Sequence, residues 1–60
     1  MINKDIFHYN DKNQKHGYWE IYWQTGNLAF KGNYLNGQKI EYWEVYYPNG
    51  DLSEKTYYIL

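Results

Sequence analysis

Apolar and aromatic side chains alternate with other residues along most of this chain, with the two-residue period of a β-strand. The alternation is clearest in residues 17–24. One side of that segment carries Trp19, Ile21 and Trp23, and the other carries Tyr18, Glu20 and Tyr22. Residues 39–47 repeat the pattern, with Trp43, Val45 and Tyr47 opposite Tyr42, Glu44 and Tyr46. We therefore predict two strands that direct their tryptophan side toward the core.

Turn signals separate these two strands from three others. Residues 28–35 and 52–59 fit full strands, and residues 2–9 fit a short, charged edge strand. Gly26, Asn36-Gly37 and Pro48-Asn49-Gly50 mark the turns, with the Asn-Gly pairs expected in left-handed conformations. The predicted fold is all-β, a single antiparallel meander sheet of about five strands built from β-hairpins.

Gly32 interrupts the apolar side of the predicted strand 28–35, between Phe30 and Tyr34. Glycine inside a strand marks either a bulge or a place where another group approaches the backbone closely. We predict a bulge here, or an aromatic ring from a neighbouring strand that lies flat on the glycine.

The chain contains an internal repeat. Residues 18–28 have the sequence YWEIYWQTGNL, and the segment that starts 24 positions later (42 − 18) has the sequence YWEVYYPNGDL. A period of this length is typical of repeat architectures, in which each copy is one supersecondary unit that buries its apolar side against its neighbours. Residues 1–60 are expected to form one repeat domain.

Composition narrows the class of protein. Cysteine is absent, which excludes disulfides and thiolate metal sites. Six lysines and no arginine stand against seven acidic residues, so the basic face that duplex nucleic acid requires is not expected. No stretch approaches the roughly 20 apolar residues of a membrane span, and the first ten residues do not resemble a signal peptide. We expect a cytoplasmic protein without a membrane partner.

Tyrosine is the unusual feature of this composition. Aromatic residues make up 23% of the chain, and nine of them are tyrosines, while the mean hydropathy is −0.97. A tyrosine buries a large ring and keeps a polar tip, which reconciles the two values. A domain of this size is marginally stable by itself, so we expect dense aromatic packing or a homo-oligomer.

The repeated segments resemble the bacterial variant of the MORN repeat, found in proteins grouped as YwqK-like antitoxin components. The resemblance rests on the pattern G-Y-W-E-x-Y-W-x-x-G-x-L-x-x-K-G-x-Y-x-N-G and on its second copy, Y-W-E-x-Y-Y-P-N-G-x-L-x-x-K. Two positions of the second copy differ: Glu41 stands where glycine is expected, and Thr56 stands where the first copy has Gly32. The resemblance implies successive β-hairpins and a role in protein interaction, and it implies no catalytic activity and no cofactor.

The side of the sheet opposite the tryptophans is the candidate site. It carries Tyr18, Glu20, Tyr22, Tyr42, Glu44 and Tyr46. A single sheet of sixty residues cannot cover both of its faces, so one face is expected to bind a protein partner or a second copy. We predict a small, non-enzymatic interaction module that binds and neutralises a protein through this aromatic and acidic face. Antitoxins and phage-encoded inhibitors are modules of this kind.

Two other functions fit the same residues. Stacked tyrosine and tryptophan rings could bind a nucleotide, with Lys31, Lys39 and Lys55 on its phosphates. Alternatively, the chain could be a structural repeat that stacks end to end through residues 57–60. Catalysis by Glu20 and Glu44 is not favoured, because a flat meander offers no cleft and the repeat itself explains the pair. His8 and His16 lack further converging ligands, so no metal site is predicted.

Overall fold

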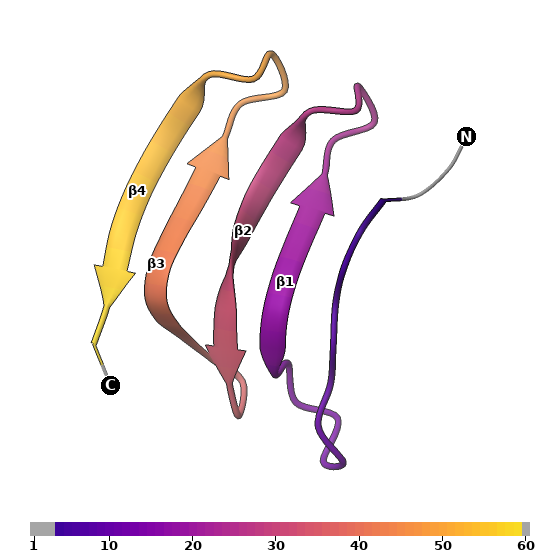
Figure 1. The fold of residues 1–60 in the computed structure, drawn as a ribbon, viewed down its shortest axis with the longest axis vertical. Coiled ribbons are helices and arrows are strands. Elements are labelled where there is room, and N and C mark those ends of the chain that lie inside the picture. Colours follow the sequence, from indigo (N-terminus) through magenta and orange to yellow (C-terminus); the bar gives the residue numbers. More distant parts are fainter. Residues whose placement is uncertain (1–3, 60) are drawn as a thin grey trace.

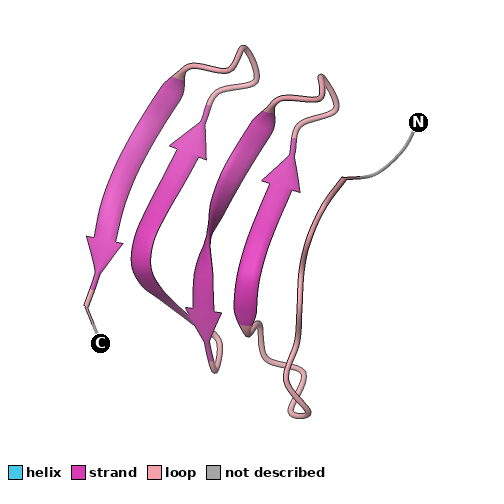
Figure 2. Cartoon of the chain, viewed as in Figure 1, coloured by secondary structure: helices cyan, strands magenta, loops and turns pink. Residues whose placement is uncertain are grey.

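The computed structural model describes residues 4–59, which form one antiparallel sheet and no helix (Figures 1 and 2). Its strands are β1 (Gly17–Tyr22), β2 (Leu28–Leu35), β3 (Gln38–Tyr46) and β4 (Leu52–Tyr58), and they lie side by side in sequence order. The Cα atoms extend over 33 × 27 × 10 Å, the dimensions of a single layer. The predicted all-β meander is confirmed, with four strands rather than about five.

The predicted strand 2–9 differs from what the structure shows. Ile2 lies outside the described residues. Residues 4–9 run beside β1 and make isolated bridges only, from Ile6 to Glu20 of β1 and from Tyr9 to Lys15, which precedes β1. One reason is that the Asp5 carboxylate accepts the backbone N–H of Tyr22 at 2.9 Å, where a paired strand would present a carbonyl. This N-terminal segment still covers the outer edge of β1.

Positive backbone φ angles define the turns. Asn36 and Gly37 have φ angles of 49° and 90°, which gives the two-residue hairpin expected between β2 and β3. The loops after β1 and β3 match each other, with Gly26 at 97° and Gly50 at 99°. The expectation that Asn49 is also left-handed is wrong, because its side chain accepts the N–H of Asp51 in a local turn.

The buried core lies on the tryptophan side of the sheet. Trp19 and Trp43 are 6% and 2% exposed, and Tyr34 of β2 lies between them with ring centroids 5.4 and 4.8 Å away. No second layer covers this cluster within residues 4–59, so the rings bury one another. Other side chains pack at its margins: Phe7, Tyr9, Ile21, Phe30 and Tyr58.

Gly32 receives an aromatic ring, as predicted, and a bulge lies opposite it on β3. Lys31 is level with Glu44 and Asn33 with Ile40, so Gly32 alone faces residues 41–43. The indole of Trp43 lies directly on it, and a Cβ built on Gly32 would be 2.2 Å from the ring. The indole N–H then donates to the carbonyl of Asn33 at 3.0 Å. The glycine therefore makes room for the most deeply buried side chain of the core.

A lysine lies over each of the two core tryptophans. Lys15 is 5.4 Å from the Trp19 ring centroid, and Lys39 is 5.1 Å from that of Trp43. Each ammonium also lies over a tyrosine one strand away, Lys15 over Tyr34 and Lys39 over Tyr58. These cation–π contacts recur with the 24-residue period, and the lysine stems cover apolar rings that a second layer would otherwise cover.

Trp23 and Tyr47 do not join the core, contrary to the alternation. They are 41% and 54% exposed, because β1 ends at Tyr22 and β3 ends at Tyr46. Trp23 instead donates its indole N–H to the carbonyl of Tyr46 at 3.0 Å. The side chains of Thr25 and Asn27 reach the carbonyl of Pro48 in the same way. These bonds tie the loop of the first hairpin to the loop of the second.

Candidate functional site

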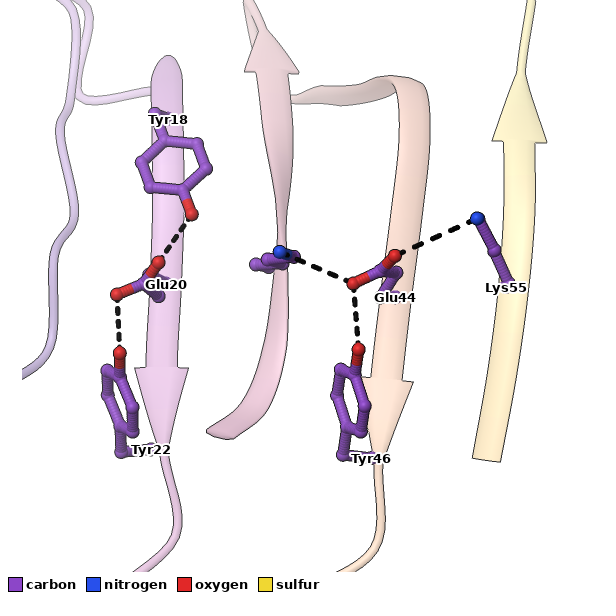
Figure 3. A network of polar contacts seen from close by, with 7 residues as sticks. Tyr18, Glu20, Tyr22, Glu44, Tyr46 and Lys55 are labelled. Carbon is purple, nitrogen blue, oxygen red and sulfur yellow. Dashed lines mark hydrogen bonds and ion pairs between the residues drawn. The ribbon is translucent and has the colours of Figure 1, made fainter. Parts of the chain in front are cut away.

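The six predicted residues lie on the side of the sheet opposite the core, and we call this surface the tyrosine–glutamate face. Tyr18, Glu20 and Tyr22 come from β1, and Tyr42, Glu44 and Tyr46 come from β3. β2 separates these two strands and contributes Lys31 to the same surface. Figure 3 shows the polar contacts among most of these side chains.

In the first copy, one carboxylate holds two tyrosines. The hydroxyls of Tyr18 and Tyr22 each donate to a different oxygen of Glu20, both at 2.5 Å (Figure 3). Residues two apart on a strand share a face, so this contact follows from the Y-W-E-x-Y spacing. The two hydrogen bonds lower the pKa of Glu20, and the bond to Glu20 raises the pKa of Tyr18 to about 12. The carboxylate is thus held ionised, and both rings are fixed along the strand.

The second copy uses the same contact on one side only. Tyr46 donates to Glu44 at 2.8 Å, and the ammonium groups of Lys31 and Lys55 lie 3.4 and 3.9 Å from its carboxylate oxygens. The hydrogen bond from Tyr46 and these charges lower the pKa of Glu44. Tyr42 instead packs edge-on against Tyr57, with ring centroids 4.6 Å apart, and it remains 63% exposed.

Acid and base side chains alternate across the sheet at one level. Glu20 is level with Lys31, Lys31 with Glu44, and Glu44 with Lys55, one residue from each strand in order. We call this row the charge ladder. Because two carboxylates face two ammonium groups, the tyrosine–glutamate face is less acidic than its sequence indicates.

The sequence did not single out Tyr57 as part of this surface. The feature that could have identified Tyr57 is its position directly opposite Tyr42 on the neighbouring strand, which follows from the hairpin register. The lysines considered for phosphate contacts divide between the two sides of the sheet. Lys31 and Lys55 lie on the tyrosine–glutamate face, whereas Lys39 lies over Trp43 on the core side. The three do not converge on one anion, which weighs against the nucleotide hypothesis.

The two carboxylates of this face act as ionised hydrogen-bond acceptors. Both carboxylates have lowered pKa values, whereas a general acid at neutral pH needs a raised one. Within residues 4–59, no three histidine or acidic side chains gather where they could hold a metal ion. His16 accepts the backbone N–H of Asn36 through Nδ1 at 3.2 Å, which gives it a structural contact. The same residues include no helix long and apolar enough to cross a membrane.

A comparison with protein-family models matches the MORN repeat variant at residues 15–36 and 42–59, two thirds of the chain. The chain belongs to the MORN repeat variant family. The first MORN match covers the hairpin of β1 and β2, and the second covers most of β3 with β4. Searches of curated proteins and of solved structures gave no match.

The two departures from the MORN-variant pattern have visible structural effects. Glu41 keeps the left-handed backbone of its equivalent Gly17, with φ angles of 62° and 90°. Thr56 is the residue of the second copy that corresponds to Gly32, the residue on which the Trp43 ring lies in the first copy. The Thr56 hydroxyl donates to the Glu54 carboxylate at 2.9 Å. The second copy therefore adopts the same fold with a strained residue at its start and no space for a ring on its last strand.

Proposed function

We propose that this MORN-variant protein is a non-enzymatic interaction module that binds and neutralises a protein partner through its tyrosine–glutamate face. The observation that carries the proposal is the pairing of tyrosine hydroxyls with carboxylates on β1 and β3. An antitoxin or a phage-type inhibitor that blocks a host protein is the biological role we infer for it.

The hydrogen bonds prepare the rings for binding. Ordering a free side chain at an interface costs about 0.5–1.5 kcal/mol, and Tyr18, Tyr22 and Tyr46 are already ordered by their carboxylates. Tyrosine is among the residues that dominate binding energy at interfaces. The rings lie on the surface of a single-layer sheet, which suits a broad protein surface better than a small ligand.

The charge ladder supports a partner chosen by shape more than by charge. Glu44 already contacts Lys31 and Lys55, and the two carboxylates are matched by two ammonium groups. Steering by long-range attraction is therefore weak, and the aromatic rings provide most of the buried area. We expect binding that changes little with salt.

The test compares two tyrosines of similar exposure. Tyr42 lies on the tyrosine–glutamate face, and Tyr47 lies beyond the end of β3, with 63% and 54% exposure. The tagged protein and its Tyr42→Ala, Tyr46→Ala and Tyr47→Ala variants are used to capture proteins from the source cells with a crosslinker. A partner retained by the wild type and Tyr47→Ala, and lost by Tyr42→Ala, supports the proposal. It is wrong if Tyr42→Ala and Tyr46→Ala both retain every protein that the wild type captures.

Self-association is part of the same proposal, because a second copy is another protein that could cover a face of the sheet. Light scattering over a concentration series measures it. A dimer that dissociates in the Tyr42→Ala variant would place the tyrosine–glutamate face in the homodimer. A monomer at all concentrations leaves this face free for another protein and removes the homodimer.

A further inference from the structure

The two edges of the sheet differ. Residues 4–9 lie along the outer edge of β1, and the backbone N–H and C=O of Ile6 pair with Glu20 at 2.8 and 2.9 Å. β4 is the other edge, and it pairs only with β3 among the described residues. Figure 1 shows β4 alone at its side of the sheet. An edge of this kind offers unpaired backbone groups to any extended segment that can align with it.

We propose that the open edge of β4 accepts an extended acidic segment of a protein partner as a fifth strand. This edge adjoins the tyrosine–glutamate face and shares Lys55 with it, and the inference does not rest on the function proposed above. Strand addition of this type takes affinity from main-chain hydrogen bonds and specificity from the side chains at alternate positions.

The charge ladder specifies the acidic residue. Lys31 of β2 has a glutamate on both sides, Glu20 in β1 and Glu44 in β3. Lys55 has Glu44 on one side, 3.9 Å away, and open edge on the other. A strand added in the same antiparallel sense as its neighbours brings one residue level with Lys55. A carboxylate there extends the ladder, whereas a lysine is repelled.

Thr56 specifies a second residue of the added strand. On β2, Gly32 receives the ring of Trp43, the residue that precedes the ladder glutamate of β3. Thr56 is the equivalent position of β4, and it carries a branched side chain. A large ring before the acidic residue of the added strand would collide with the Thr56 side chain if it lay over that residue as Trp43 lies over Gly32. The fitting segment has a small residue followed by a carboxylate.

A second copy of this chain fits the edge less well. Its β1 edge is already covered by residues 4–9, and its β4 would bring Lys55 against Lys55 when the two strands pair symmetrically about that residue. Like charges directly opposite each other are destabilising in an antiparallel pair. The charge pattern thus favours an acidic partner over self-pairing.

The experiment uses peptides with the sequence of β3, whose own glutamate pairs with Lys31 and Lys55. The probe is a labelled peptide of residues 38–47 with Trp43→Ala. One control peptide also carries Glu44→Lys, and another keeps Trp43. Binding to the full chain is measured by fluorescence anisotropy, and backbone amide shifts in ¹⁵N NMR spectra locate the contact.

We expect the probe to shift amides of Leu52–Tyr58 and to bind about fivefold more tightly than the Glu44→Lys peptide. In the Lys55→Gln protein, the ratio of the two peptide affinities should fall to about one. The Thr56→Gly protein should bind the Trp43-containing peptide as well as it binds the probe. No β4 shifts with any peptide up to about 1 mM, or equal binding of the Glu44→Lys peptide to the wild type, would overturn the proposal. Shifts along β1 instead of β4 would overturn it as well.

Discussion

Gly32→Ala tests the central packing contact of the sheet. The added methyl would lie 2.2 and 2.3 Å from the Cδ2 and Cε2 atoms of Trp43, inside any possible contact distance. The backbone itself accepts alanine, because Gly32 is not among the positive-φ glycines. The substitution therefore isolates the collision with the ring from any effect of backbone strain.

The expected loss of stability follows from the packing and the hydrogen bond that the Trp43 ring would lose. Forcing a side chain out of a packed core costs about 1–3 kcal/mol, and the hydrogen bond from Trp43 to Asn33 adds about 1 kcal/mol. A total near 3 kcal/mol is large for sixty residues, for which the whole free energy of unfolding is about 3–9 kcal/mol. At about 4–8 °C per kcal/mol, we expect the Tm to fall by at least about 10 °C.

Thermal unfolding followed by circular dichroism measures this loss, with Thr56→Ala as the matched control. Thr56 is the equivalent residue on β4, and its replacement should change the free energy of unfolding by less than about 1 kcal/mol. A double variant with Trp43→Leu completes the cycle, because a smaller side chain should relieve most of the penalty. A Gly32→Ala protein that melts within about 2 °C of the wild type, or a penalty that Trp43→Leu leaves unchanged, would refute the reasoning.

Other predictions concern backbone strain and pH. Glu41→Gly should raise the free energy of unfolding by about 1 kcal/mol in urea, since a left-handed φ strains glutamate and not glycine, and Gly17→Ala should lower it. The hydrogen bonds that lower the pKa of Glu20 contribute stability above its unfolded value of 4.5, and this contribution is lost as the pH falls through the lower folded value. The Tm should thus fall more between about pH 6 and 3 in the wild type than in Glu20→Gln. The pKa of Tyr18 is raised to about 12, which contributes stability that is complete below the unfolded pKa of 10.0 and is lost as the pH rises toward 12. Between about pH 9 and 11, the Tm of Tyr18→Phe should therefore fall less than that of the wild type. If the wild type and the variant lost the same Tm in either comparison, the proposed link between that group's pKa and stability would be wrong.

Strand alternation and turn residues predicted most of the fold. Residues 28–35 form β2 with the predicted bounds, and Asn36-Gly37 forms the predicted two-residue turn. Alternation failed where strands end, since Trp23 and Tyr47 continue the pattern beyond the last paired residue. Sequence periodicity records which side a residue would face in a strand, and it does not record where hydrogen bonding stops.

The contacts of the candidate site could be predicted in part. The spacing of Tyr18, Glu20 and Tyr22 places them on one face, and the structure adds that both hydroxyls turn to the carboxylate. That choice depends on side-chain rotamers, which no spacing reveals. Lys15 and Lys39 recur with the 24-residue period, so their common role beside the tryptophans was open to inference. The repeat indicates that the two lysines have equivalent positions, but a positively charged side chain is not expected on the core side of a sheet.

The bonds between the two hairpin loops have a direction. Trp23, Thr25 and Asn27 donate from the first loop, and the backbone carbonyls of Tyr46, at the end of β3, and of Pro48, in the second loop, accept. At the positions equivalent to Trp23 and Asn27, the second loop has Tyr47 and Asp51, which lack the indole and amide donors. A hairpin inserted between the two copies with the sequence of the first copy could both accept hydrogen bonds from the loop before it and donate to the loop after it. One joined after β4 would lie beside a loop that lacks the indole and amide donors at these two positions. The protein can therefore lengthen from its middle more readily than from its C-terminal side, which gives duplication of this repeat a preferred site of growth.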